Sequence, residues 1–207
     1  MGASRSVAAS EPAVLGFRVK SGRAVAVLLS GSATRPVVEA RREIQLADPE
    51  RPATFQPFHD SIGVHTIAAK RATERLVAIV EKRARRSITL LLEDDVVAEK
   101  RILGAALVVG SMIDPSTIAN DHIRAHAEEG RLFRIVLAGA CQSAGLRTET
   151  FLEKELLFVA GKKLRRPAAR LRTVVNAIGR GAIPWRADEK SAALAAWVLL
   201  ASTSANS

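Results

Sequence analysis

The chain is poor in the residues that cross-link small proteins and stack on nucleobases. It has a single cysteine, Cys141, so no disulfide can form within it, and we expect a cytoplasmic protein because the cytoplasm is reducing. Cys141 lies in the apolar stretch 135–144, which is typical of a buried, unreactive thiol. With six phenylalanines, two tryptophans and no tyrosine, the chain cannot supply an extended aromatic platform for bases.

Long hydrophobic runs and several catalytic motifs are also missing. The longest apolar runs, 102–113 and 192–201, are shorter than the roughly 18–20 residues of a membrane-spanning helix, so we expect no membrane partner. There is no Gly-x-x-x-x-Gly-Lys-Ser/Thr phosphate loop, no Gly-x-Ser-x-Gly elbow and no cysteine–histidine zinc spacing. These absences argue against phosphate-loop nucleotide hydrolases, serine hydrolases of the elbow type and zinc fingers.

Positive charge is the property that the chain has in excess. Its 31 Lys and Arg residues against 21 Asp and Glu give a net charge of +10. Such a charge favours polyanions as partners, nucleic acid among them. At 207 residues and 48% hydrophobic content, the chain suits one globular domain. We place that domain at residues 13–201, with a flexible tail over 1–12 and a short tail over 202–207.

Alternating apolar and polar residues predict three strands at the start of the domain. Residues 13–20 and 23–30 are apolar-rich, and Ser21-Gly22 between them is a hairpin signal. Residues 37–46 place one apolar set on a single face: Val38, Ala40, Ile44 and Leu46. Three prolines within residues 47–60 predict no regular structure there.

Helices and two further strands follow. The predicted helices cover residues 62–86, 121–144, 167–179 and 188–201. Residues 102–110 predict a buried strand, and residues 148–159 favour a strand while remaining compatible with a helix. Residues 87–100 fit either a strand or a helix. The order predicts an α/β fold with a mixed central sheet that opens with an antiparallel three-stranded meander and has helices on both faces.

This order, with its residues, resembles the ribonuclease H-like superfamily, and within it the Holliday-junction resolvase branch. The likeness spans residues 14–201. Val14-Leu15-Gly16-Phe17-Arg18 looks like the opening strand of that family, and Ala106-Leu107-Val108-Val109-Gly110 looks like its central strand. Residues 129–146 look like the next helix, Glu153-Lys154 stands where a strand ends in a lysine, and residues 188–195 look like the last, acid-bearing helix.

The resemblance implies two Mg²⁺ ions held by about four carboxylates gathered from distant elements. This sequence departs from that pattern where the chemistry is needed. The first-strand aspartate position carries Arg18, the central-strand glutamate position carries Gly110, and the second acid of the last helix falls on Ser191, whereas Asp188 matches. A guanidinium at this place would repel metal ions and would pair with any remaining carboxylate. The sequence therefore favours a domain that is not catalytic and holds no cofactor.

One alternative would restore a metal site. If residues 88–92 were the central strand, Glu93 would lie at its carboxyl end and could join Asp188 in holding Mg²⁺ or Mn²⁺. The other interpretation of this segment is a solvated acidic turn beside basic helices.

A second alternative rests on His122, His126 and Glu129, which share one helix face at spacings i, i+4 and i+7. Together with Asp188 they are the candidate catalytic residues. The trio would ligate one metal, perform acid–base chemistry or pair with phosphate. It equally fits an internally hydrogen-bonded cluster with Asp121 as helix cap. Arg124 and Arg131 are predicted to project away from the trio. His59 and His65 flank the start of the first predicted helix, and the sequence alone does not place them relative to this rim.

The strongest electrostatic signal lies near the carboxyl terminus. Residues 156–187 contain no acid and eight bases, six of which form the candidate nucleic-acid-binding set: Lys162, Lys163, Arg165, Arg166, Arg170 and Arg172. Such a run lines a phosphate backbone or forms a solvated helix face.

Three functions therefore stay open. The first is a catalytically degenerate domain that binds the backbone of DNA or structured RNA. The second is an active metal-dependent nuclease with relocated ligands, and the third is a protein–protein interaction module with an acidic partner. A homodimer is compatible with each of them.

Overall fold

The computed structural model describes residues 10–64 and 66–204. Its central sheet has five strands in the order β3-β2-β1-β4-β5. They are β1 (Pro12–Lys20), β2 (Arg23–Gly31), β3 (Pro36–Gln45), β4 (Arg101–Val109) and β5 (Thr148–Leu152). The first three strands pair antiparallel, while β4 runs parallel to β1 and to β5. The predicted mixed sheet with an opening meander is confirmed.

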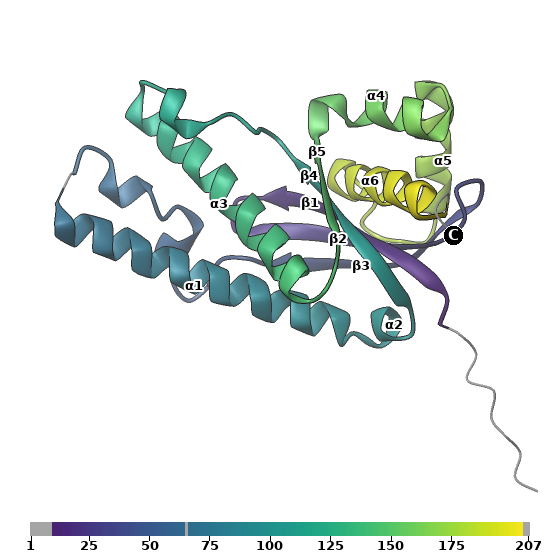
Figure 1. Cartoon of the computed structure of the whole chain (residues 1–207), viewed down its shortest axis with the longest axis horizontal. Coiled ribbons are helices and arrows are strands. Elements are labelled where there is room, and N and C mark those ends of the chain that lie inside the picture. The colour runs from purple at the N-terminus through teal and green to yellow at the C-terminus, as the bar shows by residue number, and fades with distance from the viewer. Residues whose placement is uncertain (1–9, 65, 205–207) are drawn as a thin grey trace, which may run out of the picture.

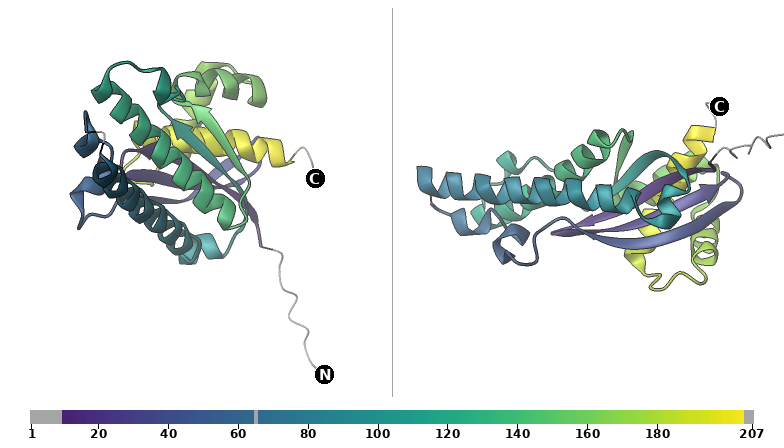
Figure 2. Two further views of the ribbon diagram at one scale, coloured as in Figure 1. Left: turned by 60° about the vertical axis from the view of Figure 1, so that its left-hand side comes forward. Right: turned by 90° about the horizontal axis from the view of Figure 1, so that it is seen from below.

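Helices cover both faces of the sheet, as predicted (Figures 1 and 2). The long helices α1 (Ile67–Leu92) and α3 (Asp121–Ser143) lie on one face. The other face carries α6 (Ala187–Ser204), with α4 (Glu153–Leu164) and α5 (Ala168–Ile178) packed outside it. Because both faces of the central strands are covered, β1 and β2 are apolar along nearly their whole length.

Each face has its own hydrophobic core, and alternate residues of β1 point to each. Leu15 and Phe17 pack with α1 and α3, whereas Val14 joins the core beneath α6. The last helix is buried from Ala192 to Leu200 and includes Trp197, whose indole N–H donates to the carbonyl of Ala33. Within the described residues, no helix is long and apolar enough to cross a membrane.

In β3, one residue of the predicted apolar face lies on the opposite face of the sheet. Leu28 pairs with Ala40 and Leu29 with Val38, so Glu39 is an extra residue that forms a bulge. Val38 consequently joins the core under α6, while Ala40 and Ile44 stay with the core under α1. Alternation in the sequence cannot reveal a bulge, because a bulge shifts the faces without changing the pattern of residue types.

The ambiguous residues 87–100 are helical, so the interpretation of residues 88–92 as a central strand is wrong. Helix α1 begins at Ile67, with Thr66 as its N-cap, and continues to Leu92. The predicted helix began at residue 62 and ended at residue 86. Ile88 and Leu91 continue the buried face of that helix. A short helix, α2 (Asp95–Ala98), follows.

The bounds of several other elements differ from the predicted ones because of local packing. Residues 153–159 are helical and not part of the predicted strand, because Leu156 and Ala160 bury one face of α4 against α6. The proline-rich loop contains two short 3₁₀ turns, η1 (Pro52–Phe55) and η2 (His59–Ser61), where no regular structure was predicted, and η3 (Pro115–Thr117) precedes α3. Helix α6 includes residues 202–204 of the predicted tail, and residues 1–9 and 205–207 lie outside the described residues.

Cys141 is fully buried in the core beneath α3, and burial raises the pKa of its thiol to about 12. Because the thiolate is the reactive form, we expect the folded protein not to react with Ellman's reagent near pH 8. Protein unfolded in guanidinium should release one equivalent of chromophore. Equal rates in the folded and unfolded protein would contradict the burial of this thiol.

Candidate functional site at the carboxyl edge of the sheet

Three parallel strands, β1, β4 and β5, end at the same edge of the sheet, where open α/β folds bind their ligands. Arg18 lies near the end of β1, Gly110 follows β4, and Glu153 follows β5 as the first residue of α4. Asp188, in the first turn of α6, approaches from one face of the sheet. The fold therefore brings together, at one edge of the sheet, most of the positions on which the resemblance depends: Arg18, Gly110, Glu153 and Asp188.

Arg18 occupies the centre of this edge. It is only 4% exposed and donates to both carboxylate oxygens of Glu153, with 3.1 Å from Nε to Oε1 and a shorter contact from Nη2 to Oε2. Its Nη1 also donates to the carbonyls of Val19 (2.8 Å) and Val108 (3.4 Å). The predicted pairing of this guanidinium with a remaining carboxylate is confirmed.

Asp188 also faces cations. Its carboxylate lies 3.9 Å from Nε of Arg18, 3.4 Å from Nζ of Lys20 and 3.8 Å from Nη2 of Arg23. A pair of Mg²⁺ ions needs several carboxylate oxygens free to converge on it. Here a buried guanidinium stands between the two carboxylates, so these residues do not fit the carboxylate-bound metal pair of the ribonuclease H-like family.

A neighbouring acid escaped the sequence prediction. Glu189 is 2% exposed and accepts from Nη2 of Arg41 at 2.8 Å and from the backbone N–H of Arg186 at 2.9 Å. Burial raises its pKa, but these hydrogen bonds outweigh burial and hold the pKa below its usual value. Glu189 thus anchors the start of α6 to β3. In the sequence, the only signal for this role of Glu189 was its position in the first turn of the last predicted helix.

Glu93 does not meet Asp188. It follows α1, whose buried side packs on one face of the sheet, while α6 packs on the other. The acidic turn is ordered by its neighbours: Asp94 accepts two hydrogen bonds from Arg42, at 2.7 and 3.0 Å, and caps α2. The hydrogen bond from Arg42 lowers the pKa of Asp94. A metal site built on Asp188 and Glu93 is therefore excluded by their placement.

The polar trio of α3 is held together, and a residue from the loop joins it. His122 and His126 approach within 3.1 Å through their Nε2 atoms, and His126 Nδ1 lies 3.4 Å from Glu129. His59 of η2, which the sequence alone did not place, reaches Glu129 through Nδ1 at 2.6 Å. His65 lies outside the described residues. Asn120 caps α3 in place of the predicted Asp121, which pairs with Arg124 instead.

A cavity of about 250 Å³ connects the carboxyl edge with α3. Arg18 and Lys20 line it from β1, and His126, Arg131 and Arg134 line it from α3. Arg131, predicted to project away from the trio, is among the residues that border the same cavity as His126. None of the described residues that line this cavity is acidic.

The six predicted nucleic-acid-binding residues lie elsewhere, on α4, on α5 and in the turn between them. Five are exposed, and the sixth, Arg166, is partly covered where it lies over the ring of Trp197. Among the described residues only Lys163 of this set forms an ion pair, with Glu149 at 2.6 Å. The charge of the α4–α5 surface is therefore largely uncompensated.

Comparison with known proteins identifies the fold. Thermus thermophilus RuvC is similar with a TM-score of 0.51, and the match covers 90% of this chain and 92% of that chain at 10% identity. T. thermophilus RuvC in complex with Holliday junction substrate gives a TM-score of 0.50, with 90% of each chain covered at 11% identity. No protein-family model and no curated protein matches the sequence. The chain has a ribonuclease H-like fold, as its sequence predicted.

Proposed function

We propose that this ribonuclease H-like domain binds the sugar–phosphate backbone of nucleic acid, and that the carboxylates at the carboxyl edge of its sheet do not cut that backbone. One observation carries the proposal. Of the eight bases in residues 156–187, seven are exposed, and the same segment contains no acid. Exposed cations without carboxylate partners are free to neutralise phosphates and release the condensed counterions.

Two further features support this proposal. Arg18, buried between Glu153 and Asp188, stands where the fold places metal ligands, which favours binding over hydrolysis. The cavity beside it, lined by Arg131 and Arg134 and by no described acid, offers a second place for phosphate. The net charge of +10 favours fast, salt-sensitive association.

One exposed ring lies next to the α4–α5 surface. Phe158 is 65% exposed, and Nζ of Lys162 lies 4.3 Å from the centre of its ring. A single aromatic ring beside a lysine can stack on one base, but it does not make a platform for successive bases. We therefore infer that recognition is led by the backbone and has little sequence preference.

The proposal predicts a specific salt dependence. Neutralising three exposed cations in the triple variant Lys162→Gln, Arg170→Gln, Arg172→Gln should weaken binding of a 20-base-pair duplex. If each contacts one phosphate, the slope of log K against log [salt] should become shallower by about 2.7, since each contact contributes about 0.9. Fluorescence anisotropy between 50 and 200 mM NaCl measures this slope.

The matched control removes the same charge from another face. Lys70, Arg71 and Arg75 are exposed on α1, and their triple replacement by Gln also lowers the net charge by three. We expect a change in slope of less than one for this control. Equal losses in the two variants would show that the α4–α5 surface is not the binding site. Mg²⁺-dependent cleavage that an Asp188→Ala variant loses would contradict the non-catalytic half of the proposal.

A further inference from the structure

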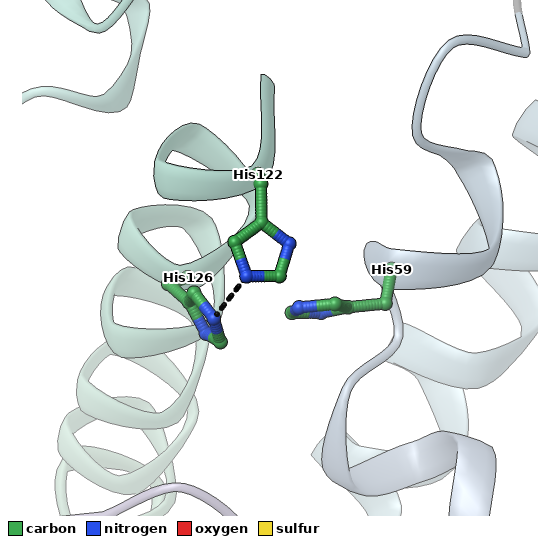
Figure 3. Close-up of side chains that lie close together, drawn as sticks. All are labelled: His59, His122 and His126. Atoms are coloured by element: carbon green, nitrogen blue, oxygen red, sulfur yellow. Dashed lines mark hydrogen bonds between the residues drawn. The ribbon is translucent and has the colours of Figure 1, made fainter. Parts of the chain in front are cut away.

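Three histidine rings from two separate segments face one another between α3 and the segment that carries His59 (Figure 3). His122 and His126 come from the first two turns of α3, and His59 comes from η2, more than sixty residues earlier in the chain. The ring centres lie 4.6 to 5.2 Å apart, each pair edge to face. One ring nitrogen from each histidine lies within 4.8 Å of the other two.

The buried carboxylate of Glu129 contacts two of these rings. Glu129 is 1% exposed and has His59 and His126 as its ion-pair partners, with 2.6 Å to Nδ1 of His59 and 3.4 Å to Nδ1 of His126. Glu129 accepts a hydrogen bond from Nδ1 of His59, so this nitrogen carries the hydrogen, and Nδ1 of His126 faces the same carboxylate. In the neutral imidazole of His59 the Nε2 atom then holds a lone pair. This carboxylate–histidine arrangement is the one that orients metal-ligating histidines in proteins.

The spacing of the nitrogens suits a tetrahedral metal ion. With ligand bonds of about 2.0–2.1 Å, two nitrogens on one Zn²⁺ are about 3.3–3.4 Å apart. The Nε2 atoms of His122 and His126 are 3.1 Å apart already. The present separations of the three nitrogens are at most 4.8 Å, so His59 completes the set by moving inward by about 1.5 Å at most. Its position in a short 3₁₀ turn, and not in a long helix, permits such a shift.

We propose that His59, His122 and His126 bind one divalent transition-metal ion of the Zn²⁺ class, with Glu129 as the residue that positions two of the ligands. Imidazole nitrogens suit Zn²⁺ and its neighbours and are poor partners for Mg²⁺. Three protein ligands leave a fourth position for water or an anion. His122 and His126 are exposed, so this position is open to solvent, and His126 also borders the basic cavity at the carboxyl edge.

Direct titration tests this site, with Zn²⁺ as the probe and a chromophoric chelator as competitor. We expect one ion per chain in the full-length protein. His122→Ala and His126→Ala should each weaken binding by at least about 100-fold, since three ligands become two. Glu129→Gln should weaken it by about 10–100-fold, the usual effect of losing a carboxylate behind a ligating histidine. Glu128→Gln, on the same turn of α3, serves as the control and should leave the affinity unchanged.

A second measurement separates a lost ligand from lost folding. Zn²⁺ should raise the melting temperature of the wild type, because it ties η2 to α3, and Mg²⁺ at the same concentration should not. His122 and His126 are exposed on their helix, so the alanine variants should fold and melt cooperatively without this metal response. Zn²⁺ affinity that is unchanged in both alanine variants, or no binding by the wild type, would overturn the proposal. Neither outcome bears on the nucleic-acid-binding surface proposed for α4 and α5.

Discussion

Replacing Gly16 with alanine should unfold the domain at a much lower urea concentration than the wild type. Gly16 lies in the middle of β1, where α6 crosses the sheet. A Cβ atom at this position would lie 2.0 Å from the carbonyl oxygen of Ala192 and 2.9 Å from the Cβ of Ala196. The first of these contacts is with backbone, so no side-chain rotation relieves it. The helix would have to move away from the strand.

The cost of that movement follows from what α6 buries. Residues 192–200 are all buried, and they hold the core on this face of the sheet together. Overpacking of a dense core costs about 1–3 kcal/mol, and more when backbone must shift. We therefore expect Gly16→Ala to lower the free energy of unfolding by about 3 kcal/mol or more. Urea denaturation followed by circular dichroism measures this change.

Gly139→Ala provides a control, because its expected effect on the free energy of unfolding has the opposite sign. Gly139 lies inside α3, and a Cβ atom built there meets no described atom within 4 Å apart from its chain neighbours and the backbone of its own helix. Alanine should stabilise that helix by up to about 1 kcal/mol, because it restricts the unfolded chain and favours the helix. If Gly16→Ala unfolded at the same urea concentration as the wild type, the close approach of β1 and α6 would be wrong.

The fold was predictable because its signals are local and repeated. The hairpin turn with Gly22, at φ 75°, and the buried strand β4 each follow from a few consecutive residues. Boundaries that depend on packing between distant elements were less predictable. Residues 88–92 are rich in Leu and suit a strand by composition, but they are helical because Ile88 and Leu91 fall on the buried stripe of α1.

The candidate site was predictable only in part, for a related reason. The helical spacing predicted that His122, His126 and Glu129 lie together, and the resemblance, which implies an acid at the position of Arg18, led to the prediction of an ion pair. No sequence pattern could show that Glu153, the start of a new helix, is the carboxylate that this guanidinium binds. That pairing depends on β1 and β5 ending on either side of β4, which only the three-dimensional topology determines.

Replacing Arg18 should reveal whether the carboxyl edge retains the capacity to bind metal. Arg18→Asn removes the hydrogen bonds to Glu153 and adds no charge. We expect it to lower the free energy of unfolding by about 2 kcal/mol, the usual value for hydrogen bonds to a charged group. Glu153 is partly exposed, with 41% of its side chain accessible, so water compensates for part of the lost pairing.

Arg18→Asp goes further, because it sets a third carboxylate beside Glu153 and Asp188. Three like charges should repel one another, so this variant should be less stable than Arg18→Asn in the absence of divalent ions. Mg²⁺ prefers oxygen ligands and should restore much of the lost stability, while leaving Arg18→Asn unchanged. Thermal melts with and without 10 mM MgCl₂ provide the comparison, and Mg²⁺ is poorly held by the histidines of α3. An identical Mg²⁺ response in the two variants would mean that the carboxylates do not converge. A response confined to Arg18→Asp would identify this one guanidinium as the group that keeps the carboxylates of this edge from holding a divalent ion.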